Sequence, residues 1–204
     1  MIIKTIKVGQ LKTNCYIVAS KDTREAVIID PGDEPEKIIE AIETEKLKPI
    51  LIVNTHAHPD HVGANAMIAD RYCIDAAAGE DGLVLMRDFK DYFEEFSGMK
   101  VEDLRLKKFL ADGDTIKIGD IEMEVIKTPG HSKGGICLLA NGSLFSGDTL
   151  FSGTYGRTDT PGGSEHEILE SIAKLMSLPD DTNVYPGHGA PTTIGDERYL
   201  YAKN

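Results

Sequence analysis

The sequence predicts a single domain with a layered α/β (α+β) sandwich fold, and three observations lead to this prediction. The chain has 204 residues, which is enough to bury a sizeable core and close to the usual size of one domain. No internal repeat, low-complexity tract or Gly/Ser-rich linker divides it, so we expect one domain over residues 1–204. Short apolar runs rich in Val and Ile alternate with helical patterns, which is typical of sheets covered by helices.

Nine short runs have the length and composition of β-strands, because they are rich in β-branched residues and are bounded by turn-forming residues. These predicted strands are Ile2–Val8, Cys15–Ala19, Ala26–Ile29, Ile50–Val53, Thr115–Ile118, Ile121–Lys127, Gly135–Leu139, Ser143–Phe145 and Asn183–Tyr185.

Four segments show helical periodicity, namely Pro35–Leu47, His61–Tyr72, Glu80–Phe96 and Glu165–Leu178. Ser164 and Glu167 form a capping box that predicts the start of the last helix. The segment from Gly79 to Lys108 mixes aromatic and acidic residues. It fits either a lid over a pocket or a surface helix whose aromatic side chains pack on the core.

Composition excludes several classes of partner. Thirty-four acidic residues against 22 basic ones give a formal net charge of −12, which repels nucleic acid. No apolar stretch approaches the ~20 residues that span a bilayer, and the first residues lack the apolar core of a signal peptide. We therefore expect no membrane partner and a cytoplasmic protein. Cys15, Cys73 and Cys137 lack the spacing of a disulfide or thiolate metal site, which predicts buried, reduced thiols.

Five predicted strands end in a loop that carries a potential metal ligand. The ligand residues of these loops are Asp30, His56, His131, Asp148 and His188. Sites in layered α/β folds gather beyond strand ends, where loops converge on a rigid base. The five loops are therefore expected to meet at one site.

The densest loop reads His56-Ala57-His58-Pro59-Asp60-His61. An H-x-H-x-D-H pattern arises by chance in such a chain with a probability on the order of 0.0005, so the motif is a strong signal. In an extended segment His56 and His58 point the same way and can bind one ion. Pro59 favours a turn into a helix, which directs Asp60 and His61 elsewhere, towards a second ion.

The remaining strand-end loops complete two ligand sets, since catalytic zinc sites use three or four protein ligands. We predict that His56, His58 and His131 hold one ion, that Asp60, His61 and His188 hold the other, and that Asp148 bridges them. Five imidazoles and two carboxylates without a thiolate suit two divalent transition-metal ions, with Zn favoured and Fe or Mn possible, rather than Ca or Mg.

Two polar residues near this pattern have other expected roles. His166 lies in the helix that begins after Ser164, outside the strand-end loops, and we predict a solvated surface side chain. The Asp30 loop contains no histidine, so Asp30 is expected to orient a ligating imidazole rather than to bind metal.

With these residues in order, the chain resembles the metallo-β-lactamase superfamily, and the resemblance covers essentially the whole sequence. It is most similar to the short bacterial relatives of type II glyoxalases, the hydroxyacylglutathione hydrolases. Four segments carry this similarity: Thr128-Pro129-Gly130-His131-Ser132, Gly147-Asp148-Thr149-Leu150-Phe151, Gly156-Arg157-Thr158-Asp159 and Pro186-Gly187-His188-Gly189. The resemblance implies an αββα sandwich with the metals at one edge.

The resemblance also sets the limits of the substrate prediction. Only 16 residues follow His188, whereas longer type II glyoxalases carry a C-terminal helical domain that supplies much of the glutathione pocket. The thiol part of the substrate is therefore left open, as is the oligomeric state. Persulfide dioxygenases share the fold and a similar Gly-Arg-Thr-Asp segment, which gives an alternative with one iron held by His56, His131 and Asp148.

A hydroxide between two divalent ions is a nucleophile at neutral pH, because metal binding lowers the pKa of water from roughly 15.7 towards about 7. We therefore expect hydrolysis of a small thioester, whose thiolate leaving group needs little help from an acid. Asp60 is the candidate catalytic residue, and the loop residues Lys133 and Tyr155 are candidate contributors. Arg157 either anchors a substrate carboxylate or makes a structural ion pair. β-Lactam or lactone substrates and a noncatalytic metal-binding module of the same fold are the remaining alternatives.

Overall fold

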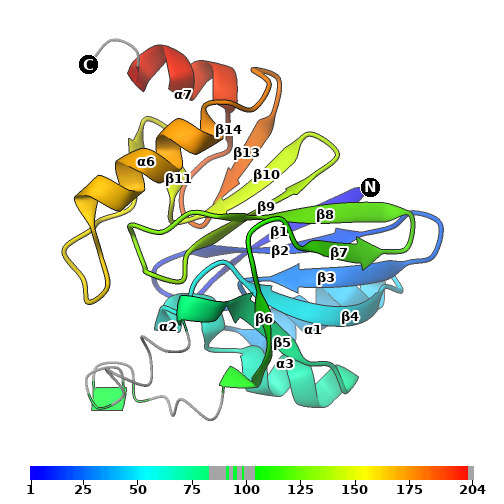
Figure 1. The fold of residues 1–204 in the computed structure, drawn as a ribbon. Coiled ribbons are helices and arrows are strands. Elements are labelled where there is room, and N and C mark those ends of the chain that lie inside the picture. Colours follow the sequence, from blue (N-terminus) through cyan, green and yellow to red (C-terminus); the bar gives the residue numbers. More distant parts are fainter. Residues whose placement is uncertain (83–90, 92–93, 96–97, 99–103, 202–204) are drawn as a thin grey trace.

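The structure is a computed structural model that describes residues 1–82, 91, 94–95, 98 and 104–201. Within these residues two six-stranded sheets pack face to face (Figure 1). The first sheet contains, in spatial order, β1 (Ile2–Val8), β2 (Thr13–Ala19), β3 (Glu25–Ile29), β4 (Lys48–Asn54), β5 (Ala76–Gly79) and β6 (Leu106–Leu110). The second contains β14 (Thr192–Thr193), β13 (Asn183–Pro186), β10 (Ser143–Gly147), β9 (Ile136–Ala140), β8 (Ile121–Lys127) and β7 (Thr115–Ile118).

Both sheets mix strand directions. In the first sheet β1, β2 and β3 are antiparallel, whereas β3 to β6 run parallel. In the second sheet β10 and β13 are parallel, and the other neighbouring pairs are antiparallel. Strands β11 (Leu150–Phe151) and β12 (Thr154–Tyr155) form a small separate hairpin.

Helices cover the outer face of each sheet, which gives the four-layer αββα order that the family resemblance implies (Figure 1). Helices α1 (Pro35–Thr44) and α3 (Asn65–Tyr72) pack through Ile38, Ile42 and Ile68 on the first sheet. Leu175 of α6 (Glu165–Leu175) and Ile194 of α7 (Ile194–Tyr201) pack on the second. The short helix α2 (Pro59–Val62) lies in the loop after β4.

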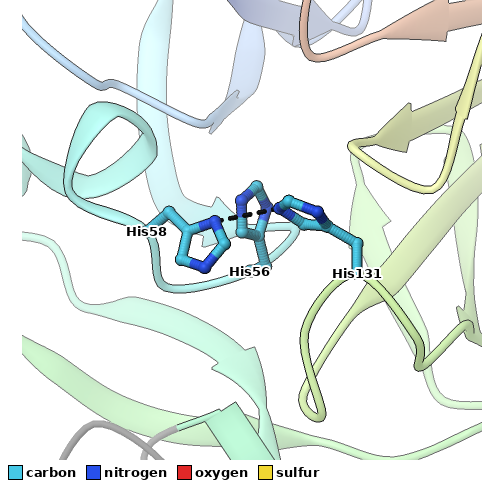
Figure 2. Close-up of side chains that lie close together, drawn as sticks. All are labelled: His56, His58 and His131. Carbon is cyan, nitrogen blue, oxygen red and sulfur yellow. Dashed lines mark hydrogen bonds between the residues drawn. The ribbon is translucent and has the colours of Figure 1, made fainter. Parts of the chain in front are cut away.

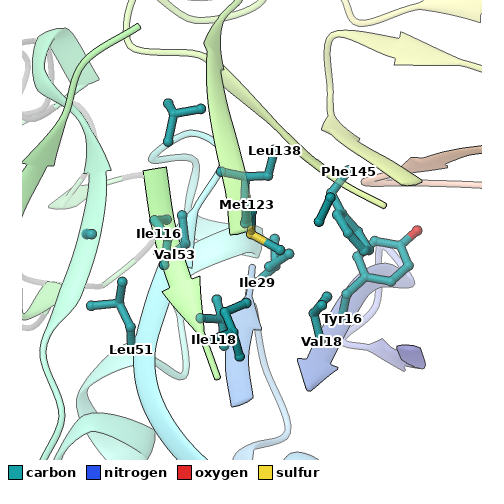
Figure 3. Packing of buried hydrophobic residues seen from close by; sticks show 14 of the residues in the cluster. Tyr16, Val18, Ile29, Leu51, Val53, Ile116, Ile118, Met123, Leu138 and Phe145 are labelled. Carbon is teal, nitrogen blue, oxygen red and sulfur yellow. The ribbon is translucent and has the colours of Figure 1, made fainter. Parts of the chain in front are cut away.

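The inner strands are apolar on both faces because each face meets a different layer. Along β3, Val27 and Ile29 belong to the core between the sheets, whereas Ala26 and Ile28 face the helices. Figure 3 shows the inter-sheet core, in which Met123 of the second sheet packs near Ile29 of the first. This core fixes the two sheets against each other and hence the relative positions of their strand-end loops.

The helix predicted over His61–Tyr72 is wrong in its bounds, because the chain forms two helices there, α2 and α3. The interruption comes from a close approach of the Asp30 loop. A Cβ on Gly63 would lie 2.2 Å from the carbonyl oxygen of Gly32, and the Ala64 N–H donates to the Pro31 carbonyl instead of to the preceding helical turn. Tertiary contact therefore overrides the helical pattern.

The sequence patterns do not predict the helix α7 or five short strands, which are β5, β6, β11, β12 and β14. Strand β5 is buried yet consists of three alanines and a glycine, which have low β propensity. The capped helix after Ser164 is confirmed, since the Ser164 hydroxyl accepts from the Glu167 N–H, but it ends at Leu175.

The helix predicted over Glu80–Phe96 and the lid predicted over residues 79–108 fall largely outside the described residues.

The prediction of buried, reduced thiols is correct for two of the three cysteines. Cys15 and Cys137 are buried free thiols, whereas Cys73 is exposed at the C-terminal end of α3. No helix within residues 1–82 or 104–201 is long and apolar enough to cross a membrane.

Substitution of Met123 by alanine tests the inter-sheet core. Met123 is fully buried, so the variant should lose about 2–5 kcal/mol of unfolding free energy through lost contacts and a cavity. Leu169→Ala on the outer side of α6, where the side chain is 46% exposed, is the control and should change stability by less than about 0.5 kcal/mol. Equal urea midpoints for the two variants would contradict this placement of the core.

Candidate metal centre

The structure brings all seven predicted ligand residues to one end of the two sheets. His56 and His58 follow β4, Asp60 and His61 lie on α2, and His131, Asp148 and His188 follow or end β8, β10 and β13. Their ligand atoms form three overlapping groups, each within 4.8 Å: His56, His58 and His131; His56, His61 and Asp148; and Asp60, His61 and His188. The grouping into two triads with Asp148 beside both is the arrangement that the sequence predicts.

The first cluster consists of His56, His58 and His131 (Figure 2). The Nδ1 atom of His58 lies 2.9 Å from Nε2 of His131, and the His56 ring lies edge-on to both other rings. His56 and His131 are buried, and His58 is half-buried. Three imidazole nitrogens therefore converge in a space that is shielded from solvent.

The second cluster consists of Asp60, His61 and His188. Nε2 of His188 lies 3.3 Å from Nε2 of His61 and 3.2 Å from Oδ2 of Asp60. Asp148 lies between the clusters, with its carboxylate oxygens 3.5 Å from Nε2 of His61 and 3.6 Å from Nε2 of both His131 and His188. One carboxylate thus reaches imidazoles of both sets.

Hydrogen bonds from outside the clusters fix the tautomers of three histidines. Nδ1 of His61 donates to Oδ2 of Asp30 at 3.0 Å, Nδ1 of His131 to the Arg157 carbonyl at 2.7 Å, and Nδ1 of His188 to the Leu11 carbonyl at 3.2 Å. In the neutral rings each Nε2 is then an acceptor that points into the site.

His56 is oriented through Thr55. The Thr55 hydroxyl donates to Oδ2 of Asp30 at 2.6 Å, so its oxygen accepts from Nδ1 of His56 at 3.1 Å. Nε2 of His56 is consequently an acceptor, and it is buried without a hydrogen-bond partner, as is Oδ1 of Asp148. Because Asp30 also accepts from His61, one carboxylate orients a histidine of each cluster, as we predicted for Asp30.

These atoms fit divalent cations. In the neutral rings, the Nε2 atoms of His61 and His188 are two acceptors that face each other. The Nε2 atom of His56 is a buried acceptor without a donor. Both arrangements are unfavourable unless a proton or a metal ion binds these nitrogens. The donors are imidazole nitrogens and carboxylate oxygens without a thiolate, a set that suits Zn, Fe or Mn. The fold thus supports divalent metal binding.

The two clusters differ in their proton affinity. Burial and the neighbouring histidines lower the pKa of His56, and the same causes lower the pKa of His58 to about 3. Burial also lowers the pKa of His131. Burial opposes a charge on His61, but Asp148 and Asp30 outweigh it and raise its pKa to about 9. The hydrogen bond to Asp60 raises the pKa of His188. The histidines of the first cluster are therefore neutral at pH 7, whereas His61 carries a second ring proton and a positive charge.

The backbone at Gly187 packs closely against Asp148 and His61 of the site. A Cβ on Gly187 would lie 2.2 Å from Oδ1 of Asp148 and 2.8 Å from Cε1 of His61. Only glycine therefore fits before His188, which explains the Pro-Gly-His sequence at the end of β13.

Two residues that support the ligands belong to none of the sequence motifs. Thr55 links Asp30 to His56, and the hydroxyl of Thr13 donates to Oδ2 of Asp60 at 3.1 Å. Both are buried threonines at an end of a strand, and polarity at an otherwise apolar strand end is the signal that points to them.

The candidate substrate residues lie on the segments that follow His131 and Asp148. Lys133 is exposed, and Tyr155 is half-buried on β12. The Arg157 guanidinium makes a bidentate pair with Asp159 at 2.6 and 2.8 Å, and both side chains are exposed. His166 is exposed at the start of α6, as predicted.

Comparisons of sequence agree with this architecture. The sequence profile of the metallo-beta-lactamase superfamily matches residues 8–188. An uncharacterised protein of Aquifex aeolicus is 39% identical over 97% of this chain and 94% of its own length. The hydroxyacylglutathione hydrolase GloC of Haemophilus influenzae is 33% identical over 97% of this chain and 95% of its own.

Solved structures give the same result. The B3 metallo-beta-lactamase BLEG-1 superposes with a TM-score of 0.85 at 34% identity over 98% of this chain and 99% of its own. TTHA1623, crystallised in a di-iron-bound form, has a TM-score of 0.85 at 35% identity over 97% and 98%. ETHE1 of Myxococcus xanthus has a TM-score of 0.83 at 26% identity over 97% and 82%.

The contrast in proton affinity gives a testable pH dependence. In metal-free protein, the His61 ring should keep its positive charge until the pH rises through about 9. His58, whose pKa is about 3, should be neutral above pH 5, and His56, whose pKa burial lowers, should be neutral at pH 7. A metal ion at the second cluster competes with the His61 proton, so its affinity should rise with pH up to about 9. NMR titration of the imidazole signals after chelation checks this. A His61 ring that is neutral at pH 7 would contradict the electrostatic analysis.

Proposed function

The chain belongs to the metallo-beta-lactamase superfamily as a metallo-hydrolase, and from that premise we propose that it hydrolyses small thioesters with two divalent transition-metal ions. The observation that carries the proposal is the pair of facing acceptor clusters joined by Asp148. A relative named as a hydroxyacylglutathione hydrolase, GloC, supports the thioester class.

We assign His56, His58 and His131 to the first ion and Asp60, His61 and His188 to the second, with Asp148 shared between them. When bound, two such ions acidify a water from a pKa of roughly 15.7 to about 7 and so supply a nucleophile at neutral pH. Zn is the proposed metal by its preference for imidazole, and the di-iron form of TTHA1623 supports Fe as the second choice.

Asp60 is the proposed catalytic residue. Burial opposes its charge, but the hydrogen bond to His188 and the charge of His61 hold the pKa of its carboxyl well below the usual range. It is therefore a carboxylate at neutral pH, and it can accept a hydrogen bond from the attacking water and orient it. Thr13 donates to the same carboxylate and limits its rotation.

The residues of the two clusters favour a thiolate leaving group. They are five imidazoles and two carboxylates that we assign to the two ions, so none of them is assigned as a general acid. A thiol has a pKa near roughly 8.5 and leaves without protonation, whereas an amine does not.

Three loop residues are proposed to contact substrate. Lys133 follows the His131 loop at the surface, and Tyr155 lies on β12 next to Gly156. The Arg157 guanidinium already donates two hydrogen bonds to the Asp159 carboxylate. A substrate carboxylate would have to displace Asp159, which reduces the binding energy that Arg157 can contribute.

The second candidate is an iron-dependent persulfide dioxygenase with a single metal. Nε2 of His131 lies 3.6 Å from Oδ2 of Asp148, and ligand atoms of His56 and Asp148 lie within 4.8 Å of each other. The three ligands that a single iron would need are therefore close together. The presence of a second complete ligand set favours the hydrolase.

Metal content tests the two-ion assignment. Purified protein reconstituted with Zn²⁺ should hold about two ions per chain. Asp148→Ala should retain at most one ion and lose ~100-fold or more in kcat/KM, because two ligand sets lose their shared group. His166→Ala, which changes an exposed side chain outside the ligand groups, should match the unchanged protein in both measurements. A plateau at one ion in the unchanged protein would contradict the binuclear assignment.

The reaction class is tested by an anaerobic assay with S-lactoylglutathione and other small-thiol esters. The hydrolase proposal predicts thioester cleavage without oxygen and with Zn or Mn in place of Fe. Asp148→Ala is the negative control and His166→Ala the positive one. Oxygen uptake with glutathione persulfide that depends strictly on Fe, without any thioester cleavage, would establish the dioxygenase instead.

A further inference from the structure

The start of β2 and the two residues before it contact the second cluster from outside. We call these residues, 11–16, the β1–β2 segment. Its Leu11 carbonyl accepts from Nδ1 of His188, and its Thr13 hydroxyl donates to Oδ2 of Asp60. Two of the three residues in the second cluster are therefore oriented by neighbouring residues of one short stretch of chain.

The same segment also holds the loop that carries His188. The backbone N–H of Asn14 donates to the Gly187 carbonyl at 2.7 Å, and its side-chain amide donates to the carbonyls of Pro186 and Gly189 at 2.9 and 3.2 Å. The Tyr16 hydroxyl donates to the Pro186 carbonyl at 2.6 Å. These bonds cross from the first sheet to the end of β13 in the second, so the position of His188 depends on β2.

The first cluster depends on other residues. Thr55 orients His56, and the Arg157 carbonyl orients His131. Among the described hydrogen bonds of these two histidines none comes from the β1–β2 segment. Asp30 supports both ligand sets, through Thr55 and through His61. The β1–β2 segment contacts the second set, so a change in this segment should weaken that set and leave the hydrogen bonds of His56 and His131 in place.

Thr13 has the most direct contact of this segment with a ligand atom. Oδ2 of Asp60, which accepts from Thr13, is the same oxygen that faces His188 at 3.2 Å and His61 at 3.5 Å. The Thr13 side chain is fully buried, whereas the Asp60 side chain is 26% exposed. Water can therefore reach the carboxylate, but it does not fix the orientation of the carboxylate as the buried hydroxyl does. Without this donor the carboxylate is free to rotate about its own bond, which moves the oxygen away from the cluster.

We propose that Thr13 is a positioning residue that determines whether the second ion binds. The proposal rests on the two-ion centre proposed above and adds that the occupancy of the two ions is set separately. Thr13 touches neither ion nor substrate in this assignment. Its effect passes through the rotation of Asp60, and the remainder of the β1–β2 segment keeps His188 opposite that carboxylate.

The test is calorimetric titration of metal-free protein with Zn²⁺. Thr13→Val keeps the shape of the side chain but removes the donor, and it should weaken binding of the second ion about 10–100-fold while the first ion binds as before. Thr13→Ser retains the hydroxyl and should restore the second ion. Thr182→Val, at a buried threonine at the opposite end of β13 from His188, is the matched control and should bind both ions normally.

The outcomes separate this inference from the proposed function. If the unchanged protein binds only one Zn²⁺, the two-ion centre itself fails. If it binds two and Thr13→Val also binds two with unchanged affinities, or loses both ions equally, the role of Thr13 is refuted. Thr13→Ala, whose smaller side chain makes no new contact, gives the same readout should the valine variant fail to fold, and loss of the second ion alone supports the proposal.

Discussion

The hydrogen bonds that the site histidines donate through Nδ1 determine which nitrogen of each ring is available inside the site. With Nδ1 of His61, His131 and His188 committed to Asp30 and to two backbone carbonyls, the opposite nitrogens face inward as acceptors. Acceptors at close range in a buried space repel one another, and either a proton or a metal ion relieves that repulsion. In metal-free protein the second proton of His61 has this role, and a divalent ion at the second cluster would replace that proton.

Asp30 is the residue through which this constraint reaches both clusters. It ends β3 in a left-handed backbone conformation, with φ of 51°, which Asp tolerates better than most residues. From there one oxygen accepts from the Thr55 backbone, and the other accepts from the Thr55 hydroxyl and from His61. Strands β3 and β4 are paired in the first sheet and packed on the inter-sheet core. This packing restricts movement of the Asp30 and His56 loops, which begin at the ends of these strands.

The convergence of the seven proposed ligand residues could be predicted from the sequence. His56, His131, Asp148 and His188 come after apolar runs, and strand ends converge in this class of fold, whereas His58, Asp60 and His61 belong to the motif that starts at His56. The sequence also predicted the supporting role of Asp30. Local patterns were insufficient where long-range contacts decide the structure. The break between α2 and α3 arises from contact with the Asp30 loop, and β5 is a strand only because it is buried between neighbours in spite of its alanines. Thr13 and Asn14 could not be assigned, since their partners lie about 50 and 170 residues further along the chain.

Anomalous X-ray diffraction from crystals of the Zn-loaded protein tests the proposed two-ion centre. We expect two anomalous peaks roughly 3.5–4 Å apart, one among His56, His58 and His131 and one among Asp60, His61 and His188, with Asp148 between them. A single peak at full zinc loading, or peaks away from these side chains, would contradict it.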